Sequence, residues 1–224
     1  MSSTETYTTR AAGPGNAMTA RDSAGTAAAP GYARALITGA VITIAGGIVT
    51  AVLRTQTTVP EDVWSHPWSS TAFAVVSPIW AISHLLVIAG LVGIHRGRLA
   101  GPGRAASAGL AVAGLGTAIL VAGELAGIPI RDASVDSSGA AIDGALFGVG
   151  TLLSAAGLLI AGRAALGAGV WRGWRRFTLL AAGIWTLLLV GIAATPAASV
   201  GIAIYGAFLL AVGVALLSQP APAS

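Results

Sequence analysis

The chain has 224 residues, of which 55% are hydrophobic and 9% charged, and its formal net charge at pH 7 is +4. Soluble domains carry about a quarter charged residues, so this composition excludes a soluble globular protein and indicates that most of the surface faces lipid. Because the sequence contains no cysteine, disulfides and thiolate metal sites are excluded as well.

The twelve basic residues are all arginines. They lie between apolar stretches, where the topology of a membrane protein requires them, so the basic composition does not indicate a nucleic-acid partner. Arginine without lysine, combined with heavy use of alanine and glycine, is typical of a GC-rich bacterial genome. We therefore expect a multi-pass protein of a bacterial cytoplasmic (inner) membrane, with the lipid bilayer as its surroundings.

Residues 1–30 are rich in Thr, Ser, Ala and Gly without an apolar period, and we expect this N-terminal tail to be disordered. Residues 31–218 form one predicted transmembrane domain, followed by a short C-terminal tail, 219–224. Six apolar stretches in this domain are each about as long as a helix that crosses a bilayer. The predicted spans cover residues 33–53, 71–93, 105–128, 144–166, 177–194 and 199–217.

Small residues recur at every fourth position in three of the predicted spans. Such a face lets a neighbouring helix approach closely, which is how helices associate in lipid. We therefore expect the spans to pack through these stripes. The stripes are Ala35, Gly39, Thr43, Gly47 and Ala51 in the first span, Ala105, Gly109, Ala113 and Thr117 in the third, and Ala203, Ala207, Ala211 and Ala215 in the sixth.

The polar segment between the first two spans contains Trp64 and Trp68. Pro60 is followed by two acidic residues, which favours the start of a helix because proline fixes φ and acids suit the positive end of the helix dipole. We expect a short segment on the membrane surface with its indoles at headgroup depth, and a lid over a binding site is the alternative. Trp171 and Trp174, beside three arginines, are predicted interfacial anchors of the same kind.

The second span contains the most specific pattern in the chain. Pro78 removes one backbone donor and should kink the outer half of the helix. Ser77, Trp80 and His84 share one face at helical spacing. At a rise of about 1.5 Å per residue, His84 lies roughly 20 Å below the outer end of the span, near the middle of the membrane.

The arginines also predict the orientation of the chain. With the N-terminus inside, ten of the twelve arginines fall on the inner side, and Arg54 and Arg131 alone on the outer side. Positive residues favour the cytoplasmic side, so both termini are predicted to be cytoplasmic. The predicted fold class is an all-α polytopic membrane protein with six transmembrane helices in one bundle.

Glu124 and His84 are the candidate functional groups inside the spans. Glu124 is the one acidic residue within a predicted span, and a carboxyl group in hydrocarbon costs several kcal/mol unless it is protonated, paired or wet. Its partner is expected to be Arg54 or Arg131, with water at the outer surface as the alternative. His84 suits either a proton carrier or a hydrogen bond between helices.

No nucleophile-elbow, zincin, Walker or dinucleotide-binding signature occurs, so the sequence offers no support for catalysis or for a cofactor. His84 and His95 lie along one helix and cannot flank a haem from opposite sides. Asp132, Asp136 and Asp143 are assigned to an outer loop, and their spacing is too loose for a calcium loop. No metal site is predicted.

Two stretches, VPEDVWSHPWSS at 59–70 and SHLLVIAGLVGI at 83–94, resemble uncharacterised multi-span membrane proteins of GC-rich bacteria. The resemblance implies a membrane location and a multi-span topology. It carries no functional residue over to this chain.

These patterns lead to three hypotheses about function, of which the first two are the main ones. The first is a pocket that opens outward between spans two and three and binds or moves a small molecule or a proton. The second is a structural or accessory subunit that assembles with itself or with another membrane protein through the small-residue faces. A membrane-embedded enzyme is the third. The residues assigned to the ligand or proton pathway are Glu124, His84, Trp80, Ser77 and Arg54.

Overall fold

The computed structural model describes residues 16–218, with side chains described from residue 30 onward. Residues 1–15 of the predicted N-terminal tail and the predicted C-terminal tail, 219–224, lie outside the described residues. Six helices in the described part are long and apolar enough to cross a membrane. The six predicted spans are therefore confirmed.

Most helix ends lie within a few residues of the predicted span ends, and the exceptions are the starts of α1 and α4. Helix α1 begins at Asn16, so residues 16–30, which the sequence assigned to a disordered tail, are helical. Ser69 and Ser137 cap α2 and α4 by accepting hydrogen bonds from the backbone of Ala72 and Ala140. Gly169 ends α4 with a left-handed φ of 65°. The helices are α1 (Asn16–Arg54), α2 (Ser70–Arg96), α3 (Arg104–Ala126), α4 (Ser138–Ala168), α5 (Thr178–Ile192) and α6 (Ala198–Leu217), with the short 3-10 helices η1 (Ile128–Ile130) and η2 (Gly173–Phe177).

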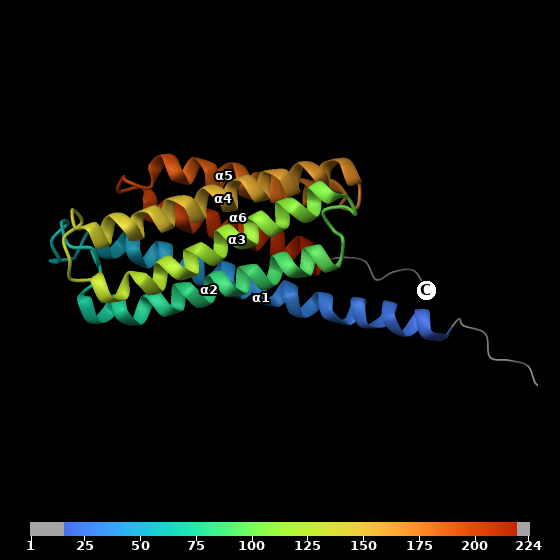
Figure 1. Ribbon diagram of the computed structural model, residues 1–224, viewed down its shortest axis with the longest axis horizontal. Coiled ribbons are helices and arrows are strands. Elements are labelled where there is room, and N and C mark those ends of the chain that lie inside the picture. Colours follow the sequence, from blue (N-terminus) through green and yellow to red (C-terminus); the bar gives the residue numbers. More distant parts are fainter. Residues whose placement is uncertain (1–15, 219–224) are drawn as a thin grey trace, which may run out of the picture.

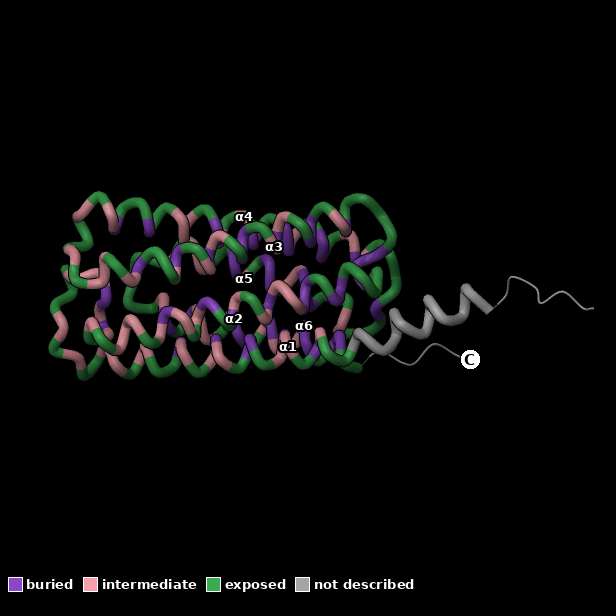
Figure 2. The backbone as a smooth tube through the Cα atoms, turned by 60° about the horizontal axis from the view of Figure 1, so that its bottom comes forward, coloured by how far each residue is buried: buried purple, intermediate pink, exposed green. Residues whose placement is uncertain are grey.

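The six helices run lengthwise beside one another (Figure 1), and their contacts close them into a ring in chain order. Each helix packs against the next one in the sequence, and α6 returns to pack against α1. Buried residues follow the inside of this ring and exposed ones its outside (Figure 2). The exposed side chains include many large aliphatic ones, such as Val75, Ile82 and Leu85, which suits a surface in contact with lipid.

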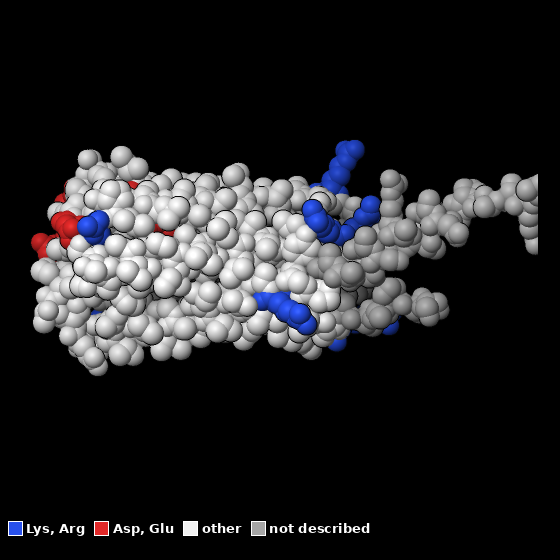
Figure 3. All heavy atoms as spheres, turned by 90° about the horizontal axis from the view of Figure 1, so that it is seen from below, with Lys and Arg blue, Asp and Glu red and all other residues white. Residues whose placement is uncertain are grey.

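The two ends of the ring differ in charge (Figure 3). We call the end formed by residues 55–69, 127–137 and 193–197 the acidic end, since it carries Glu61, Asp62, Asp132 and Asp136. The opposite end, formed by residues 97–103 and 169–177, is the basic end. It carries arginines in both segments, and α6 finishes there.

Glycines bring the backbones of α3 and α4 into contact. A Cβ atom added to Gly109 would lie 2.6 Å from the backbone nitrogen of Ala161, and one added to Gly116 would lie 2.6 Å from the carbonyl oxygen of Gly150. From the other side, a Cβ atom added to Gly157 would lie still closer to the backbone nitrogen of Ala113. A side chain at any of these glycines would push the two helices apart. The small-residue stripe predicted for α3 thus lies in this interface, except for Ala105, which is exposed.

Helix α1 makes similar contacts with both of its neighbours. A Cβ atom at Gly39 would lie 2.8 Å from the carbonyl oxygen of Ser83 on α2, and one at Gly47 would lie 2.7 Å from that of Ser199 on α6. The small-residue face predicted for α1 therefore closes the ring on two sides.

The stripe predicted for α6 is wrong in part. Ala203 does meet α1, since a Cβ atom added to Gly47 would lie 2.6 Å from its backbone nitrogen, but Ala207 is exposed. Further along α6 the contact passes to Gly206 and Gly213, which lie against Ile44 and Ile37. A four-residue step turns by about 400° around a helix, so a strict four-residue repeat drifts about 40° per step away from a straight contact face.

Large side chains fill the ring in its basic half. Trp171 belongs to this core and is 2% exposed, so its ring packs against protein, unlike the interfacial anchor that the sequence suggested. Trp174 is 53% exposed. Trp171 is buried because the segment between α4 and α5 folds over the open end of the ring. The core also contains Leu36, Leu91, Ile94, Leu110, Leu158, Leu179, Leu209, Val212 and Leu216.

The contact between α3 and α4 generates the first prediction. Replacing Gly157 by Leu forces the backbones of α3 and α4 apart, and we expect it to lower the stability of the protein by about 1–3 kcal/mol. The measurement is the apparent melting temperature of the purified protein in detergent. Gly114→Leu is the matched control, because a Cβ atom there meets nothing within 4 Å. Equal melting temperatures for the two variants would contradict this account of the packing.

Candidate functional site

The acidic half of the ring encloses a cavity of about 610 Å³. Side chains or backbone from all six helices line it, together with Trp64 from the segment between α1 and α2. The sequence predicted a pocket between the second and third spans. The cavity lies more centrally, because α6 closes the ring against α1 and brings α5 and α6 to the same space. Its volume is in the range that holds a drug-sized ligand.

Four aromatic side chains line the cavity: Trp64, Trp80 of α2, Phe147 of α4 and Tyr205 of α6. Trp80 lies directly over Gly46 of α1, where an added Cβ atom would be 2.5 Å from the indole ring. Because glycine has no side chain, position 46 leaves room for the Trp80 indole at the edge of the cavity.

Hydroxyl groups supply most of the remaining polarity of the cavity wall. Thr151 and Thr186 donate hydrogen bonds of 2.7 Å to the backbone carbonyls of Phe147 and Ala182, four residues back on their own helices. Each hydroxyl has its proton engaged, so toward the cavity it offers an acceptor oxygen. Thr43 and Ser154 complete the set.

His84 lines the cavity at the middle of α2. Its Nδ1 lies 3.4 Å from the Ser83 hydroxyl, which is 3.3 Å from the hydroxyl of Thr43 on α1. The hydroxyl of Thr43 donates to the carbonyl oxygen of Gly39. His84 is thus part of a polar chain that links α1 to α2 and also reaches the cavity.

Asp143 is the functional candidate that the sequence analysis missed. It was assigned to an outer loop, but it lies in the second turn of α4 and is 2% exposed. Its two carboxyl oxygens face the backbone of α3, where Cβ atoms added to Gly123 and Gly127 would lie 3.4 and 2.8 Å from them. Asp143 is therefore built into the wall between α3 and α4. The capping serine Ser137 was the signal that α4 begins ahead of this residue.

Glu124 and Asp143 are two carboxyl groups close enough to interact electrostatically at the acidic end of the cavity. Glu124 lines the cavity and interacts electrostatically with Asp143 behind it. The Trp64 indole N–H is directed to the Asp143 carboxyl group, but neither Asp143 oxygen makes a hydrogen bond of standard geometry within the described residues. Two ionised carboxylates so placed repel each other, and a buried one without a partner is costly.

The arginines expected to pair with Glu124 do not do so. Arg131 donates hydrogen bonds to the Ser70 hydroxyl at 2.7 Å and to the carbonyl oxygen of Ile128 at 2.8 Å. Its contact with Asp132, at 3.7 Å, is the one ion pair found among the described residues. Arg54 does not line the cavity. The acidic pair therefore has no basic partner in the part of the chain that the structure describes.

Two segments join over the acidic end of the cavity. Backbone hydrogen bonds run from Trp64 to Ala133 at 2.9 Å and from Val135 to Asp62 at 2.8 Å. The sequence suggested a helix that begins at Pro60, but the structure has none there. The backbone of Trp64 and Ser65 donates to Ala133 and Arg131 of the other segment, which interrupts the run of local turns. This pairing directs Trp64 into the cavity wall, which fits the alternative of a lid.

Two other predicted residues lie away from the cavity wall. Ser77 is 2% exposed and packs within the bundle. Trp68 is half-buried in the segment between α1 and α2, where its backbone nitrogen donates to the carbonyl oxygen of Ser65 at 2.8 Å.

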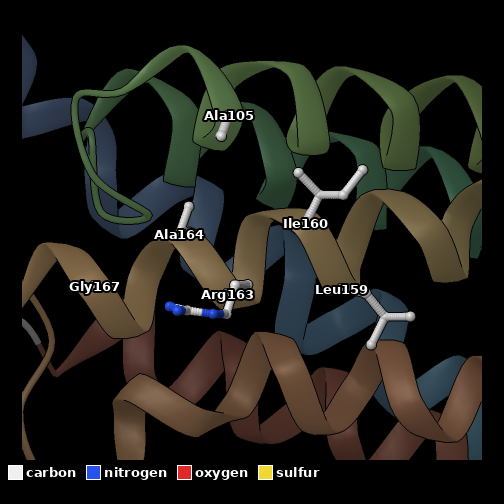
Figure 4. Close-up of a pocket in the computed structure, with 6 residues that line it drawn as sticks. All are labelled: Ala105, Leu159, Ile160, Arg163, Ala164 and Gly167. Carbon is white, nitrogen blue, oxygen red and sulfur yellow. The ribbon is translucent and has the colours of Figure 1, made fainter.

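A second hollow, of about 490 Å³, lies near the basic end and is bordered by α3 and α4 (Figure 4). Five of its six lining residues are aliphatic or glycine, and the sixth is Arg163. The guanidinium of Arg163 extends along α4 toward Gly167 and the basic end, as expected for a long side chain that reaches for headgroups. With no second polar group beside Arg163, this hollow offers no further chemistry.

No family model, no curated protein and no solved structure matches this chain.

Asp143 generates a prediction about stability. Asp143→Asn keeps the shape of the side chain and removes a buried carboxylate that has no basic partner among the described residues, so we expect it to raise stability by about 1–3 kcal/mol at neutral pH. The readout is the melting temperature of the ligand-free protein in detergent. Asp136→Asn, at an exposed position, is the control and should change nothing. A destabilised Asp143→Asn protein would show that the carboxylate has a structural partner.

Proposed function

We propose that this chain is a protein of a bacterial cytoplasmic membrane, that its acidic end faces outward, and that it binds a small molecule in its cavity. The observation that carries the proposal is the cavity itself, since it joins Glu124, His84 and Trp80, three residues that the sequence had singled out separately. A mostly apolar pocket with a few convergent polar groups is the usual form of a binding site.

The distribution of charge supports the proposed orientation. Arginines gather at the basic end, and positive residues favour the cytoplasmic side (Figure 3). The cavity then lies in the outer half of the membrane.

The way the cavity is closed supports entry from the acidic end. The lining residues Gly144, Ala193 and Ala194 are exposed, so the cavity reaches the surface where α4 begins and α5 ends. Toward the basic end the ring is filled by the core around Leu91 and Leu158. In the proposed orientation the cavity would open outward, and carrying a molecule or a proton across the membrane would require this core to part.

The second hypothesis, an accessory subunit assembled through small-residue faces, receives less support. The faces on α1 and α3 lie inside the ring, against α2, α4 and α6 of the same chain. They offer no surface to another protein. We therefore retain small-molecule binding as the proposal.

The orientation is tested with single cysteines, which are informative because the chain has none of its own. Thr58→Cys lies at the acidic end and Gly103→Cys at the basic end, both at exposed positions. In intact cells, a membrane-impermeant maleimide should label the cysteine at position 58 and leave the one at 103 unlabelled until the membrane is permeabilised. The reverse pattern would overturn the orientation and with it the outward-facing cavity.

Ligand binding is tested by filling the cavity. Gly148 lines it, and a Cβ atom there meets nothing within 4 Å, so Gly148→Phe should fold normally and occupy the space of a ligand. Small aromatic cations, anions and neutral molecules are screened for a rise in melting temperature and for quenching of tryptophan fluorescence. We expect compounds that stabilise the parent by several degrees to lose this effect in the variant.

Gly114→Phe serves as the matched control, since Gly114 has equal space around it and does not line the cavity. It should respond to the compounds like the parent. If no compound affects the parent, or if Gly148→Phe responds as strongly as Gly114→Phe, the cavity is not a binding site.

A further inference from the structure

The acidic pair and the aromatic walls together define the class of ligand. We propose that the cavity binds an organic cation with a bulky apolar body, whose charge lies at Glu124 and whose body lies between the aromatic side chains. This inference rests on the proposed function and adds the chemical class of the ligand. The following observations support it.

The charge of the cavity wall is negative and without a counter-charge. Glu124 lines the cavity and Asp143 lies behind it, whereas none of the arginines whose side chains the structure describes lines the cavity. The nearby Arg131 is bonded to Ser70 and Asp132. An incoming cation would therefore supply the positive charge that the described residues do not, while an anion would meet two carboxyl groups.

The buried carboxyl group of Asp143 adds to the negative charge near the cavity. It is 2% exposed, and neither of its oxygens has a hydrogen bond of standard geometry in the described part of the chain. Structural carboxyl groups at such depth are normally hydrogen-bonded or paired. Asp143 does not line the cavity, so its influence on a ligand is electrostatic, exerted past Gly127 and Glu124. We therefore expect it to contribute less to binding than Glu124.

The aromatic residues suit the same ligand. Trp64 lies beside the acidic pair and Trp80 deeper on α2, both in the cavity wall. The face of an indole attracts a cation, most strongly where water is excluded. An ammonium or phosphonium centre near Glu124 would thus meet a carboxylate and an aromatic face together.

The composition of the wall favours an organic cation over a bare metal ion. Among the described residues, no three His, Asp or Glu side chains converge as metal ligands require. Most of the other lining residues are aliphatic, aromatic or glycine. An apolar body would be buried in the cavity, and a hydrated ion would gain nothing from these walls.

The test compares three probes of similar size and different charge: tetraphenylphosphonium, tetraphenylborate and neutral triphenylphosphine oxide. Binding to the purified full-length protein is followed by quenching of tryptophan fluorescence in detergent, with Gly148→Phe as the blocked reference. We expect the parent to bind the phosphonium at least tenfold more tightly than either of the other probes.

The carboxyl groups are then changed one at a time. Glu124→Gln should weaken phosphonium binding at least tenfold and Asp143→Asn about threefold, while Asp136→Asn should leave it unchanged. Glu124→Asp keeps the charge and should retain most of the affinity, which separates the loss of charge from misfolding. Binding of the neutral probe should be the same in all these variants.

The outcomes distinguish this inference from the proposal beneath it. If the neutral or anionic probe binds the parent as tightly as the cation, or if Glu124→Gln keeps full phosphonium affinity, the cavity binds ligands but not as cations. If none of the three probes binds the parent more tightly than it binds Gly148→Phe, both the inference and the proposed function fall.

Discussion

The close approach of helix backbones at glycine is the constraint on which the rest of this structure depends. Lipid offers no hydrophobic drive for helices to associate, so contact between their surfaces must hold the bundle together. Gly109 and Gly157 bring α3 and α4 together, and Gly47 and Gly206 bring α1 and α6 together. The second of these contacts joins the first helix to the last and turns a row of six helices into a ring.

A ring held in this way has to be filled or left hollow along its axis. In the basic half, leucines and Trp171 fill it. In the acidic half, Gly144 and Gly148 present no side chains, and the aromatic rings stand at the margin of a cavity. The same half holds Glu124, which lines the cavity, and the buried Asp143 behind it, and neither has a basic partner among the described residues. Acidic groups buried beside an open space are typical of sites that serve a function.

The sequence predicted the features that depend on local pattern. Hydropathy located all six spans, and the helical period placed Trp80 and His84 on the face of α2 that lines the cavity. It could not predict the central position of the cavity, because that depends on the contact between α1 and α6, far apart in the chain. Asp143 was missed because its charge lowers the local hydropathy, which made the first turns of α4 resemble a loop. The segment at Pro60 was misread as helical because the segment with which it exchanges backbone hydrogen bonds lies about 70 residues further along the chain.

The central claim is that a water-accessible cavity open to the outside lies inside a closed ring of helices. The most direct measurement is a scan of single cysteines along α4, labelled in intact cells with a membrane-impermeant maleimide. The account predicts labelling at positions 144, 148 and 151, which line the cavity, and none at 149 and 152, whose side chains are exposed on the lipid side. Labelling that is absent throughout, or that follows 149 and 152 instead, would contradict it.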